Sequence, residues 1–235
     1  MNWIQHIIEP NYLALTWLPP SEKERRRLVV GQLRPENNKE VSLVYLVESS
    51  DYQEAIKKGF KGYPGLTTQK EIHKNVLDLF LKRVPSRSRR DFKKYLESIR
   101  IPTDKTISDL ALLGYSGARL PDDTFDIIHP FEEAKGPCEL LTKITGFDYY
   151  EGKHCLQKLT LNTPVTLKRE PHNPKDPDAV SVFFDSKQLG YINRVQSPVF
   201  SQWLEKGQIS QSVIEKKNGS EEHPRFYLFI SVTTN

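Results

Sequence analysis

The residues best suited to binding a ligand lie between 169 and 178, in the stretch REPHNPKDPD. Three prolines alternate there with polar side chains, and an apolar strand follows at once. Because proline restricts the backbone, such a loop can hold Asn173, Lys175 and Asp176 in fixed positions. Such a loop can present these side chains to a ligand. Asparagine and aspartate also form turns with their own backbone, so the loop can equally be a self-contained connection.

Two adjacent aromatic residues precede this loop. Tyr149 and Tyr150 lie in the segment GFDYYEG, residues 146–152, and we expect them at the end of a strand over residues 143–150. A ring at the end of a strand can be presented at the surface. Side chains alternate between the faces of a strand, so one of the two rings can instead belong to the core.

A basic segment lies in the first half of the chain. Residues 82–94, KRVPSRSRRDFKK, contain seven lysine or arginine residues and one aspartate, with a phenylalanine among them. Positive charges at the start of a helix can bind phosphates, although a solvated helix face has the same composition. The residues that would contact phosphates are Arg87, Arg89, Arg90 and Lys93.

The first half of the chain, residues 1–130, has the pattern of an α+β domain. Apolar and polar residues alternate over residues 28–47 around a polar turn, which predicts a β-hairpin. Farther on, apolar residues recur at helical spacing between capping and terminating residues. This pattern predicts helices over residues 50–59, 67–84, 86–99 and 106–120.

Proline and glycine then interrupt the pattern and predict a linker over residues 131–140. The second domain, residues 141–235, has about six short strands and a helix over residues 197–207. A sheet of short, regularly spaced strands commonly closes into a barrel, which leaves no unpaired edge strand. We therefore expect a small β-barrel. Besides residues 143–150, the predicted strands cover residues 164–170, 179–184, 189–192, 208–216 and 225–232.

Several of these pieces together resemble the HIRAN domain. They are ITGFDYYEG, PVTLKREPHNPKDPDAVSVFF, QLGYI and SPVFSQWLEKG, and the resemblance covers about residues 141–235. It implies a small β-barrel of OB/SH3-like type that binds single-stranded DNA, and in eukaryotic remodelling helicases the 3′-hydroxyl end of the strand. In those proteins aromatic side chains near the first strand hold the terminal bases. The asparagine and aspartate of the proline-rich loop help to cradle the terminal sugar.

Carried onto this chain, the resemblance assigns base stacking to the tyrosine pair and sugar contacts to the loop asparagine and aspartate. Three further residues would lie near the end of the DNA strand. The expected DNA-binding residues are therefore Tyr149, Tyr150, Arg169, Asn173, Lys175, Asp176 and Tyr191.

Three residues depart from the eukaryotic pattern. Asp148 stands where that pattern has a basic residue, Lys175 where it has a tyrosine, and Tyr191 where it has a histidine. A carboxylate near phosphates repels them. Lys175 can contact a phosphate but has no stacking face. The resemblance supports the fold, whereas recognition of a 3′ end stays open.

The first half resembles, in short pieces, the N-terminal subdomain of HipA-type toxin kinases. The pieces are RRRLVVGQLRP, GYPGL, VLDLFLKRVPSRSRRDF and ISDLALLGYSGARLP, and no GxxxxGK(S/T) phosphate loop accompanies them. Stand-alone relatives of such subdomains bind and restrain a kinase partner. An alternative function is therefore that of a protein-binding, antitoxin-like regulator whose partner is a HipA-type kinase.

Charge and composition restrict the function classes. The net charge of +4 and the pI of about 8.9 permit a polyanionic partner such as DNA without requiring one. Cys138 and Cys155 lack metal-site spacing, so we expect reduced thiols. The start of the chain lacks the features of a signal peptide, and no apolar run approaches the ~20 residues of a membrane span. We expect a cytoplasmic, bacterial-type protein with no membrane partner.

The proline-rich loop also permits a metal-dependent nuclease, since His172, Asp176 and Asp178 are possible ligands of Mg²⁺ or Mn²⁺. The loop offers only three such groups, and the sequence has no separate Glu/Lys pair at catalytic spacing. Cys155 has a histidine beside it, but neighbours on a strand point to opposite faces. We therefore expect a binding protein with no catalytic residues, metal or cofactor.

Overall fold

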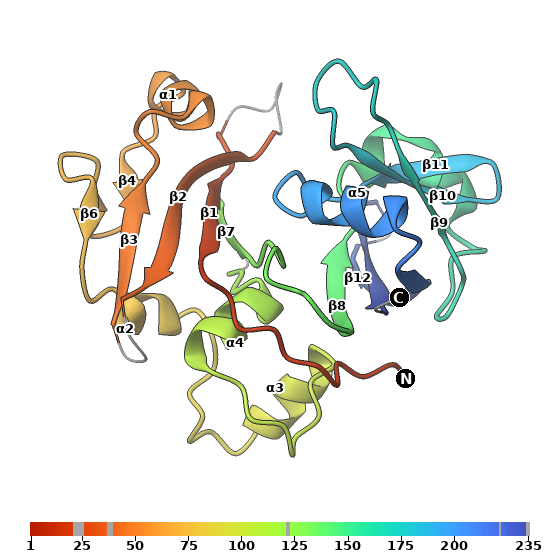
Figure 1. Cartoon of the computed structure of the whole chain (residues 1–235), viewed down its shortest axis with the longest axis horizontal. Coiled ribbons are helices and arrows are strands. Elements are labelled where there is room, and N and C mark those ends of the chain that lie inside the picture. The colour runs from red at the N-terminus through yellow and green to blue at the C-terminus, as the bar shows by residue number, and fades with distance from the viewer. Residues whose placement is uncertain (21–25, 37–39, 121–122, 221, 234–235) are drawn as a thin grey trace. The chain divides into compact units, whose positions relative to one another are not determined.

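The computed structural model describes residues 1–20, 26–36, 40–120, 123–220 and 222–233 (Figure 1). The chain divides into two compact units, each built from separate stretches of sequence. The expected domains are continuous, so the sequence analysis did not anticipate the short segments that join the second unit. The division into separately folding domains stays a prediction. The N-terminal unit comprises Glu9–Tyr95 and Thr106–Glu133, and the C-terminal unit comprises Met1–Ile8, Leu96–Lys105 and Ala134–Asn235.

A five-stranded antiparallel sheet forms the N-terminal unit, in the order β6-β3-β2-β1-β7. The predicted hairpin is confirmed by the pairing of β2 with β3, although its turn at residues 37–39 lies outside the described residues. Leu13, Leu33 and Leu43 on three neighbouring strands are fully buried. The strands are β1 (Leu13–Trp17), β2 (Leu28–Pro35), β3 (Val41–Tyr45), β6 (Ile72–His73) and β7 (Phe125–Ile128), with a separate pair β4 (Gly62–Tyr63) and β5 (Leu66–Thr67).

Capping residues determine where two of the predicted helices begin. Helix α1 (Ser50–Lys57) follows Ser49, and α4 (Asp109–Ser116) follows Ser108, whose side chain accepts a hydrogen bond from the Ala111 N–H. The helix expected over residues 86–99 is shorter and is α3 (Phe92–Ser98). Among the described residues, no helix combines the length and the apolar character needed to cross a membrane.

The helix expected over residues 67–84 is wrong over most of its length. Ile72 lies in β6 and pairs with Val44 of β3. Asn75 has a φ of 57°, a left-handed conformation that interrupts a right-handed helix. Helix α2 is therefore confined to Leu77–Leu81. Pairing with a neighbouring strand has overridden the local periodicity of the apolar residues.

Two three-stranded antiparallel sheets form the C-terminal unit, in the orders β12-β13-β8 and β11-β10-β9. Isolated bridges join Thr145 to Tyr191 and Pro164 to Val213. A closed barrel is not observed in the part of the chain that the structure describes. The predicted helix is confirmed as α5 (Ser197–Glu205). The strands are β8 (Cys138–Lys143), β9 (Thr166–Arg169), β10 (Val180–Phe184), β11 (Lys187–Tyr191), β12 (Ile209–Gly219) and β13 (Pro224–Val232).

Two buried carboxylates hold the short segments within the C-terminal unit. The Gln5 N–H donates to Glu139 Oε2 at 2.8 Å. Glu215, only 4% exposed, accepts hydrogen bonds from Asn2 Nδ2 at 2.6 Å and from Arg100 Nε at 2.5 Å. Because buried carboxylates require such partners, residues 1–8 and 96–105 are integral to this unit.

Candidate nucleic-acid interface

The tyrosine pair lies on a turn, and the strand expected over residues 143–150 is wrong. Strand β8 ends at Lys143, and two short 3-10 helices follow, η1 (Phe147–Tyr149) and η2 (Glu151–Cys155). Gly146 precedes η1 with a φ of 78°, a conformation that glycine adopts without steric cost. The chain therefore leaves the sheet just before the two tyrosines.

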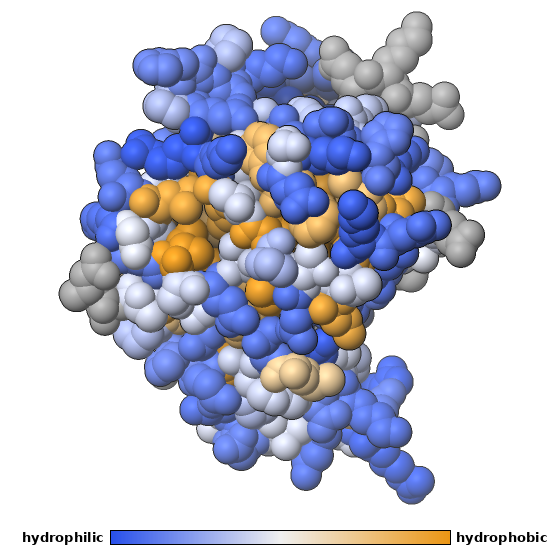
Figure 2. Space-filling view, turned by 90° about the vertical axis from the view of Figure 1, so that its right-hand side faces the viewer, coloured by the Kyte–Doolittle hydropathy of each residue, from blue (hydrophilic) through white to orange (hydrophobic). Residues whose placement is uncertain are grey.

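Both tyrosine rings are accessible from solvent. Tyr149 is 68% exposed and Tyr150 is 37% exposed. Their neighbour Phe147 is buried instead, with its ring centroid 4.8 Å from that of Phe226. The turn is thus anchored by one ring in the core and presents the next two outside it. Figure 2 shows one face of the molecule, on which hydrophobic groups interrupt a hydrophilic surface. Two adjacent exposed aromatic rings are a candidate binding feature.

Tyr191 of β11 lies beside Tyr150. Their ring centroids are 5.5 Å apart and their planes are inclined by 69°, an edge-to-face arrangement. The Thr145 and Tyr191 backbones exchange N–H···O bonds of 2.8 and 2.9 Å, which align the two segments. Gly190 permits this approach, because a Cβ there would lie 2.3 Å from the Thr145 carbonyl oxygen.

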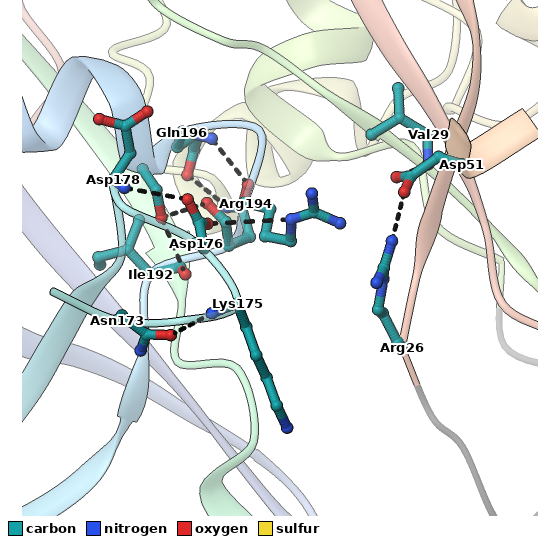
Figure 3. A network of polar contacts seen from close by, with 12 residues as sticks. Arg26, Val29, Asp51, Asn173, Lys175, Asp176, Asp178, Ile192, Arg194 and Gln196 are labelled. Carbon is teal, nitrogen blue, oxygen red and sulfur yellow. Dashed lines mark hydrogen bonds and ion pairs between the residues drawn. The ribbon is translucent and has the colours of Figure 1, made fainter. Parts of the chain in front are cut away.

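The proline-rich loop uses part of its polar side chains to fix its own backbone (Figure 3). Asn173 Oδ1 accepts a hydrogen bond from the Lys175 N–H at 3.0 Å. Asp176 Oδ1 accepts one from the Asp178 N–H, also at 3.0 Å. These are the side-chain turns that the sequence analysis kept as an alternative. They leave the Asn173 amide nitrogen and the second Asp176 oxygen for other contacts.

Glu170 connects the loop to the tyrosine pair. Its Oε2 accepts hydrogen bonds from Asn173 Nδ2 and from the Tyr191 hydroxyl, each at 2.9 Å. Burial raises the pKa of Glu170, but hydrogen bonds from Asn173, Ser181 and Tyr191 together outweigh burial and lower it. The sequence analysis missed this residue, although its position immediately before the loop was a usable signal.

The environment of Tyr191 favours its neutral form. Burial raises the pKa of its hydroxyl most, the hydrogen bond and charge of Glu170 raise it further, and a hydrogen bond with Gln188 lowers it, with a result of about 12. The neutral hydroxyl is the donor that the ionised Glu170 requires. Glu170 and Tyr191 therefore stabilise each other's charge state.

Two basic side chains lie on or beside the loop. Lys175 is exposed, and its side chain extends away from the loop in Figure 3. Arg194 Nε lies 3.8 Å from Asp176 Oδ2. The sequence analysis did not single out Arg194, which follows β11 at a distance along the chain from the loop. Its charge offsets that of Asp176 locally.

Arg169 is directed to a different part of the C-terminal unit. Its Nε donates to Ser201 Oγ at 2.8 Å, and one terminal nitrogen lies 3.2 Å from Glu205 Oε1. Both partners belong to α5. Because adjacent strand residues point to opposite faces, Arg169 and Glu170 diverge. The structure does not bring Arg169 to the tyrosine pair.

Asp148 lies close to one lysine and one histidine. Asp148 Oδ1 lies 3.8 Å from Lys153 Nζ, and Oδ2 lies 3.4 Å from His223 Nδ1. Asp148 immediately precedes the tyrosines, so its charge bears directly on any phosphate bound there. The Lys153 ammonium reduces the repulsion expected from this carboxylate.

Two of the four predicted phosphate-contacting residues form surface ion pairs within the N-terminal unit. Arg87 Nε donates to Asp109 Oδ1 at 2.8 Å, and Arg89 binds both oxygens of Asp91 at 2.9 and 2.7 Å. The Arg89 guanidinium lowers the pKa of Asp91. The other two predicted phosphate contacts, Arg90 and Lys93, are exposed.

Potential metal ligands and thiols give no further site. Within the described ranges, no three His, Cys, Asp or Glu side chains gather as a metal ion would require. Cys138 and Cys155 are both buried, and burial together with the charge of Glu139 raises the pKa of Cys138 to about 12. Both thiols are free and enclosed by the C-terminal unit.

Comparison with known families agrees with the loop and tyrosine pattern. The model of the HIRAN domain matches residues 139–233. This part of the chain is a HIRAN domain. The match begins and ends within two residues of the limits expected from the sequence, 141 and 235. The resemblance of residues 1–130 to HipA-type kinases lies outside the match and stays a hypothesis.

Two solved structures are similar to the HIRAN domain. The HIRAN domain of human HLTF is 20% identical, with a TM-score of 0.34, over 42% of this chain and 80% of that one. A protein from Lactobacillus plantarum is 23% identical, with a TM-score of 0.34, over 41% of this chain and 99% of that one. No curated protein matches the chain.

Proposed function

We propose that this HIRAN domain binds single-stranded DNA by stacking bases on Tyr149 and Tyr150, and that its role is binding rather than catalysis. HIRAN domains are associated with DNA binding. The observation that carries the proposal is the exposure of two adjacent rings on a turn whose third ring is buried. A ring held on a fixed turn loses little conformational entropy when a base stacks on it.

The position of Tyr150 supports this mechanism. Its ring is held edge-on against Tyr191, and Tyr191 is held by its hydrogen bond to Glu170. A base stacking on Tyr150 would therefore meet a ring already in place. Tyr149 is more exposed and offers a second stacking face to a neighbouring base.

Basic side chains near the loop suit the phosphates of the strand. Lys175 is exposed, and Arg194 lies beside Asp176. Contacts of this kind do not read sequence and weaken with salt. We propose that Lys175 and Arg194 bind the backbone while the tyrosines hold the bases.

A free 3′ hydroxyl is the strand end that we propose this site prefers. Asp176 retains one oxygen beyond its turn contact, and Glu170 is an ionised carboxylate in the same network. Carboxylates accept hydrogen bonds from a hydroxyl but repel a terminal phosphate. Asn173 holds Glu170 in this position through its amide.

Fluorescence anisotropy with the full chain tests the proposal. Single-stranded oligonucleotides with a 3′ hydroxyl should bind more tightly than those with a 3′ phosphate or than duplex DNA. Tyr149→Ala and Tyr150→Ala should each weaken binding about tenfold or more, and the Phe variants, which keep the ring, should bind nearly as well as the parent. Equal affinity in both alanine variants and the parent would refute the site.

A further inference from the structure

The three strands β9, β10 and β11 place several chemically active side chains on one face. Ser181 of β10 pairs with Lys168 on one side and with Tyr191 on the other. Residues directly opposite each other in neighbouring strands share a face, so Lys168 and Tyr191 flank Ser181. Two strand spacings, about 10 Å, separate their backbones. Phe183, two residues beyond Ser181, lies on that face as well.

The opposite face of this sheet is occupied. Leu167 and Val182, which pair with each other, are buried there. Arg169 also projects from that face and binds Ser201 and Glu205 of α5. Helix α5 therefore covers the face of the sheet opposite to Lys168 and Phe183. These two residues share the other face with Tyr191.

Lys168 and Phe183 form a pair with unused binding capacity. The Lys168 ammonium lies 4.5 Å from the centroid of the Phe183 ring. Lys168 is exposed, and no carboxylate within the described ranges forms an ion pair with it. Phe183 is half-buried, so part of its ring is accessible. A cation without a counterion beside an accessible ring can receive a phosphate and a base together.

We propose that Lys168 and Phe183 form a further nucleotide subsite, which continues the tyrosine site across the face of the β9–β11 sheet. The inference rests on the proposed function. Phe183 stacks on the base of a nucleotide farther along the strand, and the Lys168 ammonium turns from the ring to the phosphate of that nucleotide. The strand then passes from Tyr191 to Lys168 across β10, where Ser181 between them is itself fully buried.

The test compares a thymidine dinucleotide with an octanucleotide, using the full chain. Lys168→Gln and Phe183→Leu should each weaken octanucleotide binding by about threefold to tenfold and leave dinucleotide binding unchanged. Lys168→Gln should also reduce the slope of log affinity against log salt by about 0.7 for the octanucleotide, as expected for one lost phosphate contact. Lys187→Gln is the matched control, because Lys187 pairs with Phe184 and so projects from the opposite face.

The outcomes separate this inference from the proposed function. If the tyrosine variants lose affinity but Lys168→Gln and Phe183→Leu keep octanucleotide affinity, the subsite is overturned and the tyrosine site stands. Equal losses for both oligonucleotide lengths would show a structural effect and would also overturn it. If the parent chain binds neither oligonucleotide, the proposed function and the subsite fail together.

Discussion

The hydroxyl of Tyr191 and the amide of Asn173 converge on one oxygen of Glu170, each at 2.9 Å. This shared acceptor joins strand β11 to the proline-rich loop. It also fixes the ring against which Tyr150 lies. The Glu170 carboxylate thus links the proline-rich loop to strand β11 directly. It is linked to the tyrosine turn through the ring of Tyr191.

The Tyr191 hydroxyl can be removed while its ring is kept. In Tyr191→Phe, the edge contact with Tyr150 remains, but Glu170 loses a hydrogen bond. We expect oligonucleotide affinity to fall about threefold, because the ring is less firmly placed. The pKa of Glu170 should rise, since one of the bonds that stabilise its charged form is gone. Anisotropy and an NMR titration of the carboxyl carbon would measure the two effects. An unchanged Glu170 pKa would contradict the coupling.

The lowered pKa of Glu170 predicts a contribution to stability on the acid side. In the folded chain this pKa is below its ordinary value of 4.5. The contribution is therefore fully present above the ordinary pKa and is lost as the pH falls through the lowered one. Glu170→Gln has no charge to titrate. The free energy of unfolding of the parent should fall more than that of the variant between about pH 5 and pH 3. If the free energy of unfolding changes equally with pH in the parent and in Glu170→Gln, the Glu170 carboxylate makes no such contribution.

The loop, strands and helix of the HIRAN domain were predictable because their signals are local. Strand β10 is a mainly apolar segment that follows the proline-rich loop, and the loop between β9 and β10 has its prolines at fixed spacing. Helix α5 has a proline near its start and Gly207, in a left-handed conformation, after its end. Such features depend on neighbours in the sequence and can be recognised without tertiary contacts.

The tyrosine turn was not predictable in the same way. Phe147 and the residues around it read as a strand, but Phe147 is drawn into the core by contact with Phe226, far along the chain. The contacts of Glu139 and Glu215 with residues 1–8 and 96–105 are likewise distant in sequence. The loop and the tyrosine pair were identified from residue types and supported by family resemblance, and Tyr191 came from the resemblance alone, whereas Glu170 and Arg194 required the three-dimensional arrangement.

Removing the charge of Asp148 should strengthen DNA binding. Asp148 precedes the tyrosines and lies near Lys153, so Asp148→Asn removes a repulsive charge and releases the Lys153 ammonium. We expect affinity for a single-stranded oligonucleotide to rise about twofold to fivefold at low salt and the gain to shrink at high salt. Asp185→Asn, at the exposed turn between β10 and β11, is the control and should bind like the parent. Unchanged affinity of Asp148→Asn would mean that no phosphate lies near this carboxylate.

An isolated fragment that contains the HIRAN domain should have a lower free energy of unfolding than the same domain in the full chain. A fragment of residues 134–235 lacks Asn2 and Arg100, and so leaves Glu215, buried at 4% exposure, without these two partners.

In the full chain, Arg100→Met should cost about 3–5 kcal/mol of unfolding free energy, because it leaves a buried charge uncompensated. Arg90→Met, an exposed change in the N-terminal unit, should cost far less. Hydrogen exchange of the β12 and β13 amides under native conditions would measure the loss in the C-terminal unit itself. Equal protection of these amides in Arg100→Met and in the parent would show that the segments at residues 1–8 and 96–105 are dispensable to the HIRAN domain.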